Sequence, residues 1–100
     1  MNAQVSSKPT FRGQPVDAVI DVRSKLEFWM GHIDGATCIP VDVIGSHLPM
    51  RSDIAKNAKI LLYCASGARS AAATAELRAL GYKNVIDGGG ISTAAAKYTA

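Results

Sequence analysis

The strongest constraint on the fold is a six-residue run that becomes continuously apolar and ends in a cysteine. Residues 59–64, Lys-Ile-Leu-Leu-Tyr-Cys, contain no polar break after the first lysine. Such a run is typical of a strand buried on both faces at the centre of a parallel sheet. A glycine-containing turn follows, and then the alanine-rich stretch Ser70–Leu80 with Gly81 as its stop, which predicts a helix. The sequence therefore predicts a strand–turn–helix unit with Cys64 at the turn.

Shorter segments extend this pattern in both directions. Apolar runs predict further strands over residues 18–22, 36–39 and 84–86, and helices over residues 24–30, 42–47, 53–57 and 91–97. Ser24 and Glu27 form a capping box at the start of the first helix. The glycines 88–90 lack the spacing of a dinucleotide-binding loop and are interpreted as a turn. Alternating strands and helices predict an α/β domain with a parallel central sheet.

Length, charge and composition limit the class of protein. One hundred residues, 48% of them hydrophobic, can form one core, so residues 15–100 are predicted to be a single domain and residues 1–14 a flexible arm. The net charge of +3 is too small for the clustered basic face that nucleic acids need. No run could span a membrane and no signal peptide begins the chain. We expect a cytoplasmic monomer without nucleic-acid or membrane partners, or a periplasmic protein if a signal has been removed.

The two cysteines, Cys38 and Cys64, are too few for a disulfide framework or a four-cysteine metal site. A single disulfide between them is an alternative, although free cysteines in a reducing compartment fit the sequence better. His32 and His47 lack metal-ligand spacing and are interpreted as structural or solvated, so no metal and no cofactor are expected. An isolated cysteine after an apolar strand is most often a small buried hydrophobe, and Cys38 is interpreted in this way.

Cys64 has a different setting, because a helix N-terminus follows it at once. Unpaired N–H groups and the positive end of the helix dipole would stabilise a thiolate there and lower its pKa. Arg69 adds a positive charge, and Gly67 permits the positive φ that lets several N–H groups converge. The sequence contains neither the Gly-x-Ser-x-Gly pattern of a serine-hydrolase elbow nor a glycine-rich phosphate-binding loop that ends in Gly-Lys-Ser/Thr. The predicted binding loop consists of Ala65, Ser66, Gly67, Ala68, Arg69 and Ser70, with Cys64 as the nucleophile.

Five motifs occur in a fixed order along most of the chain. They are Asp21-Val22-Arg23, Glu27-Phe28, Gly31-His32-Ile33-Asp34-Gly35-Ala36 followed by Ile39-Pro40, Tyr63-Cys64-Ala65-Ser66-Gly67-Ala68-Arg69-Ser70, and Leu80-Gly81-Tyr82 with Asn84-Val85 and Gly89-Gly90-Ile91. In these motifs the chain resembles the rhodanese family. It departs from the family at Cys38, where Asn is frequent, and at residues 92–94, where a Trp is usual.

The resemblance implies a rhodanese-like three-layer sandwich, with helices on both faces of the parallel sheet, and a sulfurtransferase activity. The implied enzyme moves a sulfane sulfur from thiosulfate or a similar small anionic donor to cyanide or a thiol, through a persulfide on Cys64. It also implies that Arg69 meets the anionic end of the donor. Asp21 and Arg23 would brace the loop, with a plain surface ion pair as the alternative. An acceptor protein stays open as a partner.

Two other functions are weighed against thiosulfate turnover. A sulfur-carrier or relay module would use the same persulfide without turning thiosulfate over. Cysteine-dependent phosphatases and arsenate reductases share the architecture, but their loops have one more residue between cysteine and arginine. Here Cys64 to Arg69 spans six positions, which favours a cradle around one sulfur rather than a tetrahedral phosphate.

Overall fold

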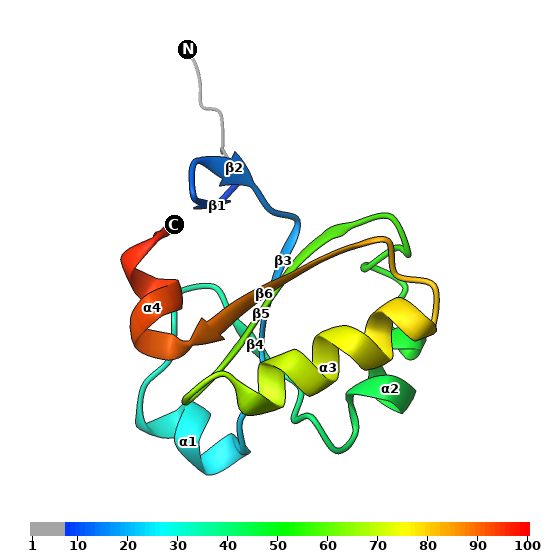
Figure 1. The fold of residues 1–100 in the computed structure, drawn as a ribbon, viewed down its shortest axis with the longest axis horizontal. Coiled ribbons are helices and arrows are strands. Elements are labelled where there is room, and N and C mark those ends of the chain that lie inside the picture. The colour runs from blue at the N-terminus through cyan, green and yellow to red at the C-terminus, as the bar shows by residue number, and fades with distance from the viewer. Residues whose placement is uncertain (1–7) are drawn as a thin grey trace.

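A computed structural model of the protein describes residues 8–100. The elements, in chain order, are β1 (Thr10–Phe11), β2 (Gln14–Pro15), β3 (Ala18–Asp21), α1 (Lys25–Met30), β4 (Thr37–Cys38), α2 (Ile44–His47), the 3-10 helix η1 (Leu48–Met50), β5 (Lys59–Cys64), α3 (Ala68–Ala79), β6 (Asn84–Gly90), α4 (Ile91–Ala96) and β7 (Tyr98–Thr99) (Figure 1). None of the helices formed by these residues is long and apolar enough to cross a membrane.

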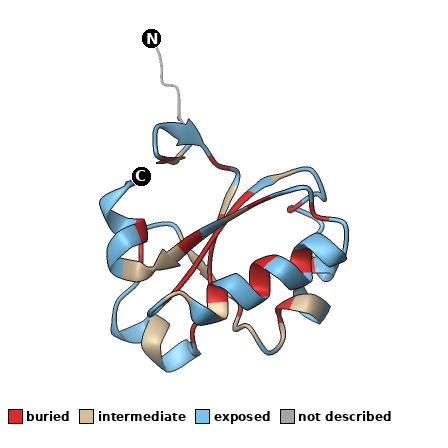
Figure 2. Cartoon of the chain, in the orientation of Figure 1, coloured by how far each residue is buried: buried red, intermediate tan, exposed pale blue. Residues whose placement is uncertain are grey.

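The centre of the fold is a four-stranded sheet in the order β4-β3-β5-β6, and every neighbouring pair is parallel. The strand β5 lies inside this sheet, and its residues from Ile60 to Cys64 are fully buried (Figure 2). The predicted α/β class and the central position of the apolar run are both confirmed.

Two hydrophobic clusters lie on opposite faces of the sheet. One joins the β5 residues Leu62 and Cys64 to Ile44 of α2 and Leu77 of α3. The other includes the β5 residues Leu61 and Tyr63, Ala94 of α4, and Phe11 of β1. Successive β5 side chains alternate between the two clusters, as the pleat of a strand requires. The predicted three-layer sandwich with helices on both faces is confirmed.

A second, smaller sheet was not anticipated. Its strands are antiparallel and lie in the order β2-β1-β7. Residues 8–14 therefore do not form the predicted flexible arm. Residues 1–7, the rest of that arm, lie outside the described part of the chain. A two-residue turn at Arg12 and Gly13, both with positive φ, joins β1 to β2 as in the common tight hairpins. Phe11 anchors the hairpin because its side chain is buried in the second cluster.

Three other predicted elements differ from the structure. Residues 53–57 form turns rather than a helix, since so short a segment with only Ile54 buried cannot sustain helical hydrogen bonding. The helix expected over residues 42–47 is shortened to α2 and continues as η1, which accommodates Pro49 near its start. The strand predicted over residues 84–86 is longer in the structure, where β6 continues through the three glycines to Gly90. The turn predicted at these glycines is therefore wrong.

Candidate active site

Cys64 lies at the carboxyl end of β5, where α3 begins four residues later. Its Sγ accepts a hydrogen bond from the N–H of Gly67 at 2.9 Å and another from the N–H of Ser70 at 3.3 Å. The thiol in turn donates to the Ser70 hydroxyl at 3.6 Å. Gly67 adopts a φ of 107°, a region that side chains rarely occupy, and this bend turns its N–H toward the sulfur.

These contacts decide the ionisation of Cys64. Burial raises the pKa of the thiol, but the hydrogen bond with the Ser70 side chain and those from the backbone N–H groups of Ser70, Gly67 and Ser66 outweigh burial, and the pKa is lowered overall. Donors that stabilise the charged form favour a thiolate. The predicted lowering of the Cys64 pKa therefore has a structural cause in the loop itself.

The loop residues differ in their exposure to solvent. Ala65, Ser66 and Ala68 are exposed, and Ser70 is buried. The Ser70 hydroxyl donates to the Gly67 carbonyl at 3.1 Å and lies 3.5 Å from the Gly89 carbonyl. Ser70 thus ties the loop to both α3 and the end of β6.

The glycines 88–90 form a wall of the site that the sequence did not indicate. The β5–β6 register shifts at this point, so that Cys64 pairs with Gly90. A Cβ at Gly90 would lie 2.7 Å from the Ala65 carbonyl oxygen and 3.3 Å from the Ser66 Cα. Because both neighbours are backbone, only glycine allows β6 to approach the loop this closely.

Arg69 does not point freely at the mouth of the loop. Its guanidinium binds both carboxylate oxygens of Glu27, at 2.7 and 3.0 Å, and this contact, with hydrogen bonds from Ser24, lowers the pKa of Glu27 to about 2. Glu27 also closes the predicted capping box with Ser24. Glu27 therefore links α1 to the loop, a second role that its capping position does not reveal.

Asp21 and Arg23 form a buried, bidentate ion pair, so the alternative of a plain surface pair is wrong. Arg23 also donates to the Gly31 carbonyl at 2.6 Å, in the segment between α1 and β4. The hydroxyl of Tyr63, next to Cys64, accepts the N–H of Ile33 at 3.0 Å. The pair fixes the segment after α1, and its effect on the loop stays a prediction.

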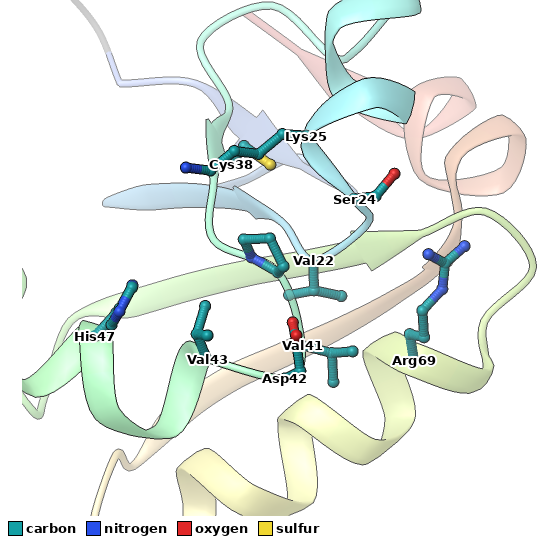
Figure 3. A pocket seen from close by; sticks show the side chains of 10 residues that line it. Val22, Ser24, Lys25, Cys38, Val41, Asp42, Val43, His47 and Arg69 are labelled. Atoms are coloured by element: carbon teal, nitrogen blue, oxygen red, sulfur yellow. The ribbon is translucent and has the colours of Figure 1, made fainter.

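A cavity of about 440 Å³ opens beside the loop and reaches Arg69 (Figure 3). Cys38 lines this cavity and is only half-buried, so its assignment to the core is wrong. His47 lines it as well, whereas the exposed His32 stacks on Phe28. Residues 8–100 contain no group of three His, Cys, Asp or Glu side chains that could hold a metal ion.

We expect the pKa values of the two thiols to differ from that of an ordinary cysteine in opposite directions. Burial raises the pKa of Cys38, while the loop donors lower that of Cys64. Because iodoacetamide reacts with the thiolate, alkylation of Cys64 should persist as the pH falls, after that of Cys38 has declined. Trypsin separates the two cysteines into residues 60–69 and residues 26–51, so mass spectrometry gives both pH profiles from one sample. Coincident or reversed midpoints would contradict the assigned donors.

Comparison with known proteins gives a consistent result. The family model of the rhodanese-like domain matches residues 7–92. A tRNA uridine(34) hydroxylase from Erwinia tasmaniensis is 40% identical over 80 residues, which make up 75% of this chain and 23% of that protein. The chain thus spans about a quarter of the length of this curated relative.

Solved structures agree with the family model. A rhodanese from E. coli is 28% identical, with a TM-score of 0.73 over 82% of this chain and 95% of its own. A human single-domain sulfurtransferase is 29% identical, with a TM-score of 0.61 over 68% of this chain and 70% of its own. With its family model, its parallel sheet and a cysteine in the loop after the central strand, the chain belongs to the family of rhodanese-like domains.

Proposed function

We propose that this chain is a sulfurtransferase that moves a sulfane sulfur from thiosulfate, or a similar donor, to a thiophilic acceptor. The observation that carries the proposal is the pair of backbone N–H groups, from Gly67 and Ser70, that converge on the Cys64 sulfur. These donors favour a thiolate, and a thiolate is the nucleophile that sulfur transfer requires.

The reaction proceeds in two displacements. The Cys64 thiolate attacks the outer sulfur of thiosulfate, the S–S bond of the donor breaks, and sulfite leaves with the electron pair. The product is a Cys64 persulfide, whose terminal sulfur the loop donors can stabilise. A cyanide ion or a thiolate then attacks that terminal sulfur. The S–S bond of the persulfide breaks, and its electron pair returns to the Cys64 sulfur as a thiolate.

The donor can reach Cys64 only if the loop opens, because the residue is fully buried. The loop residues that follow it, Ala65 and Ser66, are themselves exposed, and exposed loop segments open at lower cost than buried ones. The ion pair between Arg69 and Glu27 is more than a third exposed at Arg69, so an incoming dianion can compete with the carboxylate for the guanidinium. This exchange gives Arg69 its role at the anionic end of the donor.

The test of the proposal is intact mass after incubation with thiosulfate. We expect a gain of one sulfur, about 32 Da for a persulfide, which maps to the tryptic peptide of residues 60–69 and is lost on treatment with cyanide as thiocyanate. A gain on residues 26–51, or no gain at all, would contradict Cys64 as the sulfur carrier.

A second candidate is sulfur relay to a partner protein or domain. It is favoured by the relative from Erwinia tasmaniensis, in which the matched residues make up only 23% of the protein. A relay module would form the persulfide but release little thiocyanate in steady state. A phosphatase would instead hydrolyse p-nitrophenyl phosphate, and the six-position loop from Cys64 to Arg69 argues against that activity.

A further inference from the structure

Arg69 is shared between two anions. It lies in the first turn of α3, and its guanidinium points toward the start of α1 (Figure 3). The hydrogen bond with Glu27 is the largest cause that raises the pKa of Arg69, and the negative charge of ionised Cys64 raises it further. Arg69 is therefore near enough to the reacting sulfur to attract a donor, but Glu27 already compensates its charge.

Glu27 is held in place from both ends of its carboxylate. One oxygen accepts hydrogen bonds from the N–H and the hydroxyl of Ser24, each at 3.0 Å. Both oxygens accept from Arg69, at 2.7 and 3.0 Å, in the bidentate geometry that is the strongest for a guanidinium and a carboxylate. The capping box thus fixes a negative charge at the position where an anionic donor needs the arginine.

The effect of this fixed charge depends on the charge of the donor. Coulomb repulsion is proportional to the charge, so a carboxylate opposes a dianion with twice the free energy that it opposes a monoanion at the same place. Thiosulfate is a dianion. Methanethiosulfonate, in which a methyl group replaces one charged oxygen, is a monoanion with the same outer sulfur. The two donors therefore differ mainly in the property that Glu27 senses.

We propose that Glu27 is a positioning residue that restrains Arg69 and thereby favours sulfane-sulfur donors of single negative charge over dianions such as thiosulfate. With methanethiosulfonate the Cys64 thiolate attacks the outer sulfur, the S–S bond of the donor breaks, and methanesulfinate leaves with the electron pair. The persulfide product is the same as with thiosulfate. This inference rests on the proposed function and adds the charge class of its donor.

The test is the variant Glu27→Gln, compared with the wild type for both donors. Glutamine is compatible with a capping box, so the start of α1 should persist while the negative charge is removed. The rate of persulfide formation on Cys64, followed by intact mass, is measured against donor concentration. We expect the apparent dissociation constant of methanethiosulfonate to fall by about threefold, the effect of one exposed ion pair, and that of thiosulfate by about the square of this factor, roughly ninefold. The maximal rates should change little.

Two variants serve as controls. Asp53→Asn removes the same charge from a bidentate pair with Arg51, which is not among the residues that line the cavity at Arg69. Ser24→Ala breaks the capping box from its other side and keeps the charge of Glu27. Neither should alter the ratio of the two dissociation constants.

Several outcomes would overturn the role of Glu27 while leaving the sulfurtransferase intact. They are an equal change for both donors in Glu27→Gln, no change, weaker binding of thiosulfate, or the same shift in Asp53→Asn. A fall in the maximal rates with unchanged dissociation constants would likewise show a purely structural role. Failure of the wild type to form a persulfide with either donor would overturn both proposals.

Discussion

The variant Cys64→Ser is expected to gain no sulfur from thiosulfate and to form no thiocyanate above background. A serine oxygen can still accept hydrogen bonds from the N–H groups of Gly67 and Ser70, which bind the sulfur in the wild type. A hydroxyl, however, does not ionise at neutral pH and has no base beside it to remove its proton. The chemistry should therefore disappear while the loop stays folded. Intact mass and thiocyanate assays measure the loss, and urea denaturation measures the stability.

The matched control is Cys38→Ser, in which the hydroxyl replaces a thiol that donates weakly to the Arg23 carbonyl at 3.6 Å. We expect this variant to keep the mass gain and most of the turnover. Cys64→Ala provides a second test, because it removes the acceptor of the buried Ser70 N–H and the part-buried Gly67 N–H and should lower stability by about 1–3 kcal/mol. A sulfur adduct retained by Cys64→Ser and lost by Cys38→Ser would move the persulfide to Cys38.

The sequence predicts the central layers of the fold better than its edges. The apolar run of residues 59–64 has few alternatives to a buried strand, and the Ser24–Glu27 capping box fixes the start of α1. The small sheet was missed because its strands have two residues each, too few for any periodicity. Its turn also places Arg12 at a φ of 52°, where Asn or Gly is usual.

The sequence predicted those parts of the site whose residues are neighbours along the chain. Cys64 and its loop are contiguous, so a strand–turn–helix pattern locates them. The wall formed by residues 88–90 comes from another strand, and glycines have no side-chain pattern that could mark them as part of β6. The contact of Glu27 with Arg69 spans 42 positions, and no rule of local spacing indicates it. Likewise, only the tertiary structure places Cys38 at a cavity.

The largest expected effect on stability comes from Asp21→Ala. Asp21 is fully buried, and its partner Arg23 is 8% exposed, so the substitution leaves a guanidinium in the interior without its carboxylate. Breaking a buried pair in this way typically costs about 3–5 kcal/mol, a large part of the stability of a small domain. We expect the urea midpoint to fall accordingly with an unchanged slope. Because so large a loss can prevent folding, Asp21→Asn serves as the milder variant.

The chain contains its own control for this prediction. Arg51 and Asp53 form a second bidentate pair at the same spacing of two residues, but their side chains are 38% and 62% exposed. Asp53→Ala should therefore leave the free energy of unfolding nearly unchanged, because an ion pair so exposed to solvent contributes little to stability. The double variant Asp21→Ala/Arg23→Met removes both buried charges and should recover part of the loss, since the unpaired cation carries most of the cost. Equal losses at the two aspartates, or a double variant less stable than Asp21→Ala, would mean that burial of the Asp21–Arg23 pair is not what stabilises the segment after α1.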